Sequence, residues 1–176
     1  VRVAVTGGVY RAPEGTTLPT DATSSLNVAF NELGYVSEDG VTESQGTETN
    51  DIVAWQNGDI VRKVQTSHDL TYAFSMLETN DEVIAAFYGN GDAESYEING
   101  AQPGRFAWVI EVLDGDAHIR IVVPSAQVTE RGDKTLVNGD AIMYPFTITG
   151  YPDPAYAGVE DAPAKAYVYA DYGASA

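Results

Sequence analysis

The chain has 176 residues without cysteine, and 9 Lys and Arg stand against 26 Asp and Glu, a formal net charge of −17. The length and the 44% hydrophobic fraction suit one folded domain with a sizeable core, and no apolar run is long enough for a transmembrane helix. The composition excludes disulfides, a Cys-based zinc site and a thiol nucleophile, and the charge disfavours tight binding to nucleic acid or anionic lipid, because both need bases that neutralise phosphates.

The first 25 residues predict an extended N-terminal arm. Residues 11–25 are rich in Pro, Gly, Thr, Ser and Ala, which favours extended or loop backbone. Just after them, Leu26, Phe30 and Leu33 stand at helical spacing before a glycine, a pattern that indicates a short helix.

A long polar segment follows. Residues 37–51 contain Val41 as their one large apolar side chain, and we predict a long inter-strand loop over residues 37–59. A functional loop and a surface loop without order both fit this composition. Trp55 lies near the end of the segment, before the turn signal Asn57-Gly58, and is either a core residue or an anchor for a partner.

Alternation of apolar and polar residues dominates the rest of the chain and predicts β-strands. The expected strands cover residues 60–66, 70–76, 106–112, 117–123, 142–148 and 166–170. Trp108 alternates with apolar neighbours and is expected in the core.

Turn and breaker residues set the expected limits of these strands. Ser67-His68 is expected to form a turn, and Asp114-Gly115 predicts a tight hairpin because its turn needs positive φ. Pro124 is expected to end a strand. Pro145 removes a donor from the ladder, which favours an edge strand or a bulge.

One helix is predicted between the strands. Asn80 suits the N-cap, the two acidic residues that follow it suit the positive N-terminal end, and Gly89 suits the C-terminus. The expected buried stripe consists of Val83, Ile84 and Phe87. The fold class is therefore mainly β: a β-sandwich or barrel with one flanking short α-helix, an extended N-terminal arm and a long inter-strand loop.

The sequence contains no catalytic signature. A Gly-x-Ser-x-Gly elbow, a phosphate-binding loop and a His-Glu-x-x-His helix are all missing, so we expect no enzyme, no cofactor and no metal site. His68 and His118 are interpreted as exposed polar histidines. The run 114–116 is interpreted as a hairpin turn in preference to a calcium site, which needs more oxygen ligands.

The acidic residues are concentrated in two spans without a basic residue, 12–61 and 64–104. A solvated acidic surface explains this distribution, and so does a surface that repels an anionic partner. Charge alone leaves both interpretations open.

Several blocks, in this order and spacing, resemble the major tail proteins of long-tailed phages of actinobacteria. The blocks are residues 33–43, 51–59, 64–66, 72–74, 105–108, 122–124 and 144–147. The resemblance covers roughly residues 4–168. These are structural blocks and include no catalytic motif.

The resemblance implies a tail tube subunit, found in the virion and assembled in the host cytoplasm. Such subunits form hexameric rings that stack into a hollow tube, with an N-terminal arm and a long loop between rings. The implied partners are further copies of the chain, the tape measure protein inside the lumen, and tail terminator and tail-tip proteins at the ends. DNA passes through the lumen on ejection without specific binding, and no membrane is involved.

The same resemblance divides the chain into an arm, residues 1–25, and a single tail-tube β domain, residues 26–176. The extra C-terminal immunoglobulin-like domain of some relatives is expected to be absent. An acidic lumen would serve transit, because carboxylates keep the duplex off the wall.

We expect inter-subunit contacts from the arm, from the loop and from bases on predicted strands that would pair with carboxylates of neighbours. The candidate interface residues are Val3, Val5, Tyr10, Tyr35, Ser37, Glu38, Asp39, Thr42, Glu43, Asp51, Trp55, Arg62, Lys63, Arg105 and Arg120. Two other functions stay open: a secreted or cell-surface β-sandwich that serves as an adhesin or carbohydrate-binding module through Trp55, and an enzyme of unrecognised type.

Overall fold

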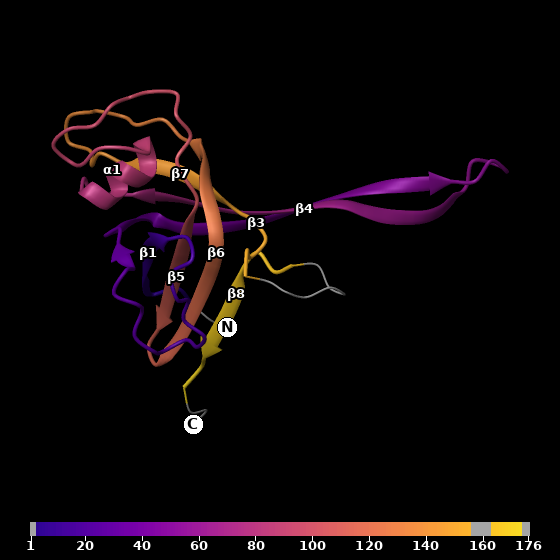
Figure 1. Ribbon diagram of the computed structural model, residues 1–176, viewed down its shortest axis with the longest axis horizontal. Coiled ribbons are helices and arrows are strands. Elements are labelled where there is room, and N and C mark those ends of the chain that lie inside the picture. Colours follow the sequence, from indigo (N-terminus) through magenta and orange to yellow (C-terminus); the bar gives the residue numbers. More distant parts are fainter. Residues whose placement is uncertain (1–2, 156–162, 174–176) are drawn as a thin grey trace.

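The computed structural model describes residues 3–155 and 163–173, and these residues form a mainly β fold with one short helix, as predicted (Figure 1). The described strands are β1 (Thr6–Pro13), β2 (Asn31–Glu32), β3 (Val36–Val53), β4 (Ile60–Met76), β5 (Phe106–Asp114), β6 (Ala117–Arg131), β7 (Tyr144–Gly150) and β8 (Tyr167–Asp171). All their pairings are antiparallel, in the order β2-β1-β5-β6-β7-β4-β3, and β8 pairs with β6.

The sheet folds back on itself at β6. The first half of this strand pairs with β5 and β8, and the second half pairs with β7. Pro124 lies at the change, inside a bulge between the pairs Trp108↔Val123 and Phe106↔Ala126. The expectation that Pro124 ends the strand is therefore wrong, because a bulge accommodates the missing backbone donor and lets the strand continue.

The main core lies between the two halves of the folded sheet. Trp108 on β5 contacts Phe74 on β4 and Phe146 on β7, with ring centroids 6.1 Å apart in both cases, although these strands are not neighbours of β5. The alternation predicted for residues 70–76 is confirmed: Leu70, Tyr72, Phe74 and Met76 are all buried. The contact with Phe74 is edge-to-face, an arrangement that adds to the free energy gained by burial.

Helix α1 (Asp81–Tyr88) closes one end of this core, and its predicted signals are confirmed. The Asn80 side chain accepts a hydrogen bond from the Val83 N–H at 2.9 Å, and Gly89 ends the helix with a left-handed φ of 83°. The Phe87 ring lies against Tyr144 and Phe146. The short helix is thus held by its caps and by its apolar stripe.

A second apolar cluster covers the outer face of the β1–β5–β6 half. Leu18, Leu26 and Phe30 pack there, beside Tyr167 and Tyr169 of β8. The helix expected over residues 26–33 does not form. The segment instead makes a turn in which the Phe30 N–H donates to the Asn27 carbonyl, so its apolar residues reach two different clusters.

The N-terminal segment also differs from the prediction, because residues 6–13 are not a free arm. They form β1, which lies between β2 and β5, with Val9, Arg11 and Ala12 buried. Gly7 permits the close approach, since a Cβ there would collide with the Glu111 carbonyl oxygen. The partner strand lies about a hundred residues away in sequence, so local composition does not reveal this strand.

The segment expected to be a loop over residues 37–59 is another correction. Most of it is β3, which pairs with β4 from Val41↔Phe74 to Val53↔Ile60. β4 also runs without interruption through Ser67-His68, where a turn was expected. The sequence shows no alternation here because β3 buries almost no side chain, so neither face is selected to be apolar.

β7 is internal, and the edge position considered for Pro145 is wrong. β7 pairs with both β6 and β4, and Pro145 is its second residue. The Pro145 carbonyl accepts a hydrogen bond from the Gly132 N–H at 2.8 Å. A bulge in β6 between Val128 and Glu130 lies opposite this strand.

Candidate assembly surface

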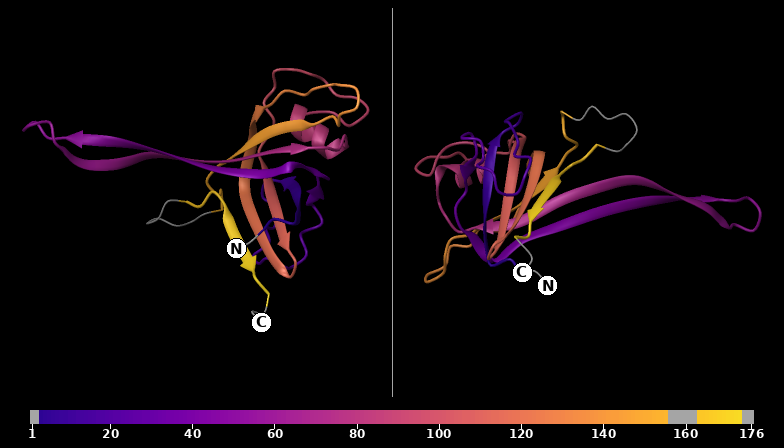
Figure 2. Two further views of the ribbon diagram at one scale, coloured as in Figure 1. Left: turned by 180° about the vertical axis from the view of Figure 1, so that it is seen from behind. Right: turned by 90° about the horizontal axis from the view of Figure 1, so that it is seen from below.

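The outer part of the β3–β4 hairpin projects from the body as a two-stranded ribbon (Figures 1 and 2). The last pair between β4 and β7 is Leu70↔Gly150, so beyond it β3 and β4 pair only with each other. We call residues 44–69 the projecting hairpin, and count Ser44 and Gln45, which lie opposite Thr71 and Leu70, as its root. A ribbon of two strands is marginally stable in water by itself, so this segment gains order if another surface covers it.

A lysine of the body contacts the projecting hairpin at its root, in addition to the strand pairing. The Lys165 ammonium donates a hydrogen bond to the backbone carbonyl of His68, next to the last β4–β7 pair. A depression lined by Glu43, Leu70 and Lys165 lies beside this contact. The ribbon therefore leaves the body at a defined place.

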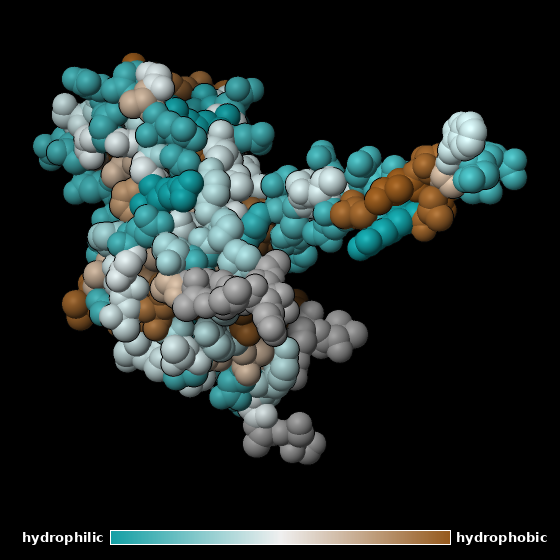
Figure 3. All heavy atoms as spheres, turned by 45° about the vertical axis from the view of Figure 1, so that its right-hand side comes forward, coloured by the Kyte–Doolittle hydropathy of each residue, from teal (hydrophilic) through white to brown (hydrophobic). Residues whose placement is uncertain are grey.

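The tip of the projecting hairpin is apolar and open to solvent. Asn57 and Gly58 have positive φ values of 59° and 70°, and the Ala54 N–H donates to the Asp59 carbonyl at 2.8 Å across the turn, so the turn signal in the sequence is confirmed. Trp55 is 96% exposed, so it is not a core residue. Of the two interpretations, the one that remains is an anchor for a partner. Figure 3 shows the hydrophobic residues gathered near the outer end, and the exposed ones are Ile52, Val53, Trp55, Ile60 and Val61.

An exposed apolar cluster of this kind marks a contact surface for another molecule. Two bases stand beside it on β4. Lys63 pairs with Asp51 across the hairpin at 2.9 Å, and Arg62 is exposed without an ion pair among the described residues. The Lys63–Asp51 pair is largely exposed and contributes only about 0–1 kcal/mol. Within the subunit Lys63 thus already has a carboxylate partner, and its pairing with a neighbouring subunit stays a prediction.

Arg120 is the clearest correction among the candidate interface residues. It is 5% exposed, and its Nε and Nη2 donate to Glu111 Oε1 at 2.8 and 2.5 Å. Its Nη1 donates to the Asp21 carbonyl at 2.9 Å, which fastens the 14–30 segment to the sheet. Burial raises the pKa of nearby Tyr10, and the Glu111 carboxylate raises it further. Arg120 is a structural residue inside the subunit.

Arg11 plays a similar part that the sequence did not reveal. Its guanidinium pairs with Glu82 on α1 at 2.7 Å and stacks 4.4 Å from the centroid of the Phe106 ring. Glu82 also accepts a hydrogen bond from Asn31 on β2 at 2.8 Å. The network joins β1, β2 and the helix, and only the tertiary structure brings these residues together.

The remaining candidate interface residues are divided among separate places. Val3, Val5 and Tyr35 are exposed on the body, and Ser37 is buried. Glu38, Asp39, Thr42 and Glu43 lie on the part of β3 next to the body, away from the hairpin tip. Arg105 stacks on the Tyr151 ring at 4.0 Å from its centroid. On a single subunit these residues therefore do not form one continuous surface patch.

In the part of the chain that the structure describes, no group of three or more His, Asp or Glu residues is arranged to hold a metal ion. The described helix is also too short to cross a membrane. Burial strongly raises the pKa of the Tyr72 hydroxyl, and Glu43 raises it further, so this group stays neutral.

Comparisons with known proteins were made on sequence and on fold. A family model described as phage tail tube protein matches residues 1–169. No curated protein matches the chain at a significant level. One similar solved structure is a chain of the virion of a native gene transfer agent particle, with 12% identity, a TM-score of 0.41, and coverage of 76% of this chain and 93% of that chain.

A second similar structure is a crystal structure of Hcp protein, with 11% identity and a TM-score of 0.36. The likeness covers 95% of this chain and 98% of that chain. Both structural likenesses are remote, so the family match alone carries weight.

Proposed function

This chain belongs to the phage tail tube protein family, and from that premise we propose that its copies form hexameric rings that stack into the hollow tube of a long-tailed phage. Its role in the virion is structural, without catalysis. In this proposal the phage infects actinobacteria, the lumen first holds the tape measure protein, and DNA then passes through it into the host. Tail terminator and tail-tip proteins contact the ends of the tube, which assembles in the host cytoplasm.

The projecting hairpin is the observation that carries this proposal. Residues 44–69 extend beyond the body as a ribbon with both faces open, and the ribbon ends in an apolar cluster that includes Trp55. A subunit in isolation gains nothing from either feature. A second copy that covers the ribbon would remove apolar surface from water. It would also supply the packing partner that a two-stranded ribbon lacks. We assign contacts between successive rings to this hairpin.

Unpaired sheet edges support ring closure. Among the described strands, β2 and β3 stand at the two ends of the strand order, and each pairs with one other strand. An open edge offers free N–H and C=O groups to another strand, and closed rings of identical subunits satisfy such edges. The sheet edges thus support contacts between subunits of one ring, and the projecting hairpin supports contacts between successive rings.

The charge of the chain is consistent with transit of DNA. A wall that bound phosphates would hold the duplex, and a net charge of −17 leaves few bases for such contacts. We therefore propose a net negative lumen and no specific affinity for DNA. Salt-sensitive DNA binding by assembled tubes would contradict this part of the proposal.

Electron microscopy and mass measurement at assembly concentration test the tube directly. A shortened variant replaces residues 48–67 with Asn-Gly, so that a two-residue turn closes the pair Thr47↔His68. The body should stay folded, because the main core uses only the part of β4 from Leu70 onward. Wild-type protein should form long tubes, and the shortened variant should give at most single rings.

A point substitution makes the same test without a deletion. Trp55→Ser should weaken tube formation, whereas Val28→Ser should not, although the two side chains are 96% and 98% exposed. Normal tubes from the shortened variant would refute the axial role. Wild-type protein that stays monomeric and binds polysaccharide through Trp55 would instead support a carbohydrate-binding module.

A further inference from the structure

Three tyrosine rings surround a lysine ammonium at the end of the body that carries α1. The Lys134 ammonium lies 5.2 Å from the ring centroid of Tyr144, 5.6 Å from that of Tyr88 and 5.8 Å from that of Tyr96. It also donates a long hydrogen bond, 3.5 Å, to the Tyr96 hydroxyl. The negative face of an aromatic ring attracts a cation within about 6 Å of its centroid. We call Tyr88, Tyr96 and Tyr144 the tyrosine cage.

The body holds the tyrosine cage in place without any contribution from the lysine. Tyr88 ends α1 and stacks on Tyr96, with ring centroids 4.4 Å apart. Tyr144 begins β7, packs against Phe87, and shares a hydrogen bond of 3.1 Å with the Thr79 hydroxyl. Tyr88 and Tyr144 are both buried. A subunit without the lysine side chain should therefore keep these rings in position.

The ammonium contacts rings and hydroxyls where a carboxylate would be the usual partner. The chain has 26 acidic residues, yet among the described residues none forms an ion pair with Lys134. Contacts with the Tyr88 and Tyr96 hydroxyls raise the pKa of Lys134, so the group stays charged at neutral pH. Several aromatic rings around one cation are the arrangement by which proteins bind alkylammonium groups.

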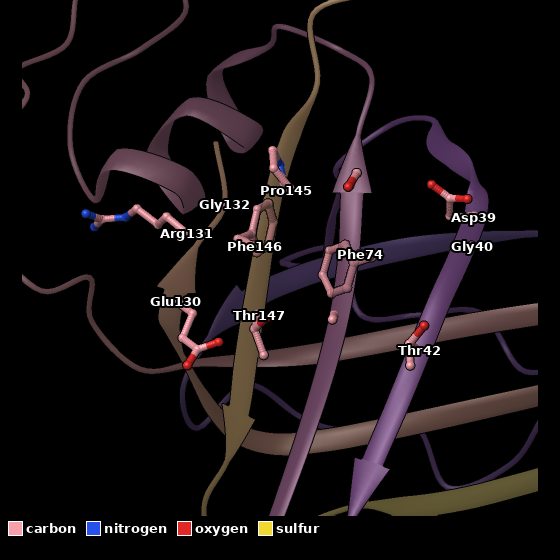
Figure 4. A pocket seen from close by; sticks show the side chains of 12 residues that line it. Asp39, Gly40, Thr42, Phe74, Glu130, Arg131, Gly132, Pro145, Phe146 and Thr147 are labelled. Carbon is pink, nitrogen blue, oxygen red and sulfur yellow. The ribbon is translucent and has the colours of Figure 1, made fainter. Parts of the chain in front are cut away.

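Lys134 also attaches the loop that carries it. Residues 132–143 connect β6 to β7 and lie beside the 89–105 segment at the α1 end of the body (Figure 1). Gly132 starts this loop beside Pro145 (Figure 4), and its N–H donates to the Pro145 carbonyl at 2.8 Å. Of residues 132–143, Lys134 alone is not exposed, and within the described chain only Gly132 and Lys134 join the loop to other segments by hydrogen bonds.

We propose that the tyrosine cage is a binding site for an alkylammonium ion, that Lys134 fills it in the subunit, and that this occupancy fixes the 132–143 loop against the body. The ligand class follows from the chemistry of the site. Ring faces attract a positive charge on an alkyl chain, whereas a neutral alcohol or an anion gains nothing from them. The site lies on the body, apart from the projecting hairpin, and exists in the subunit before any assembly.

Lys134→Ala tests the site, because the atoms that it removes are those of n-propylammonium. The probe is propylammonium chloride, followed by proton NMR with subunits below the assembly concentration, and 1-propanol and sodium chloride are the controls. Lys134→Ala should bind propylammonium saturably, with its proton signals shifted upfield by the rings, and wild type should not. Addition of Tyr96→Leu should weaken this binding roughly threefold or more, whereas Tyr96→Phe, which keeps the ring, should retain most of it.

Wild-type protein provides a measurement that needs no substitution at the site. The side-chain protons next to the Lys134 ammonium should resonate upfield of those of the other two lysines, Lys63 and Lys165. Lysine signals without this difference would overturn the cage. So would the absence of propylammonium binding to Lys134→Ala, or equal binding of 1-propanol, which would indicate an apolar pocket with no preference for charge.

Cleavage by thermolysin measures the loop. This protease cuts before large apolar residues, and Ile142 offers a site in the loop away from the substitution. Lys134→Ala and Lys134→Met should both be cut there roughly threefold faster or more, because Met keeps the apolar stem but not the charge. Lys63→Ala, which removes an exposed lysine elsewhere, should be cut at the wild-type rate. Unchanged cleavage of both Lys134 variants would show that the cage does not fix the loop.

Discussion

Removal of the charge on Glu111 should destabilise the subunit through the buried guanidinium of Arg120. The two residues are direct cross-strand partners on β5 and β6, and Arg120 is 5% exposed. Loss of one member of a buried ion pair costs about 3–5 kcal/mol, because the other charge stays buried without its counterion. The Asp21 carboxylate, 3.9 Å from Arg120 and half exposed, offsets part of this loss.

We therefore expect Glu111→Gln to lower the free energy of unfolding by about 3 kcal/mol, at the lower end of that range. For a domain of this size, each kcal/mol shifts the midpoint of thermal unfolding by roughly 2–4 °C, so the midpoint should fall by roughly 6–12 °C. The measurement is urea unfolding of subunits below the assembly concentration, followed by circular dichroism and extrapolated linearly to water.

Asp51→Asn is the matched control, since Asp51 and Lys63 are also cross-strand partners but their side chains are 34% and 61% exposed. It should cost no more than about 1 kcal/mol. The double variant Glu111→Leu with Arg120→Met removes both buried charges and should stay within about 1 kcal/mol of wild type. If Glu111→Gln costs no more than Asp51→Asn, the argument from burial is wrong. If Glu111→Gln leaves the stability of the subunit unchanged but abolishes tubes, Arg120 acts in a contact between subunits, as the sequence first suggested.

Three further predictions concern the helix, a turn and the projecting hairpin. Asn80→Ala should cost about 1 kcal/mol in urea unfolding, because the cap on the Val83 N–H is lost. Asn80→Asp should restore only this cap, because the aspartate cannot donate to the Leu33 carbonyl and repels the Glu78 carboxylate. Gly34→Ala should cost at least about 1 kcal/mol in the same assay, since Gly34 has a φ of 95° and an added Cβ would meet the Glu78 carboxylate. Amide hydrogens of residues 44–69 should exchange quickly in the subunit and slowly in the tube; equal protection in both forms would remove the axial contact.

Features that depend on neighbouring residues could be predicted from the sequence. Asn80 and Gly89 delimit α1 because each cap acts within one turn of the chain. Strands with one face on the core, such as residues 70–76, could be recognised because burial selects apolar residues at every second position. The Asn57-Gly58 turn was evident because it needs positive φ at both positions.

Other features were decided by the tertiary structure. β1 looks like a loop in composition, yet the chain pairs it with β5, about a hundred residues further on, and buries Arg11 against Glu82 of the helix. Arg120 resembles a surface base in the sequence, and only its position opposite Glu111 makes it internal.

The projecting hairpin shows the limit most clearly. Local sequence determined its turn and its polar character, but backbone pairing with β4 made residues 37–53 a strand where a loop was expected. Hydrogen bonds between backbone groups act on any sequence, so a ribbon with both faces in solvent leaves no alternation of side chains to reveal it. The apolar residues at its tip could likewise have belonged to a core in the sequence, and only the tertiary structure leaves them exposed.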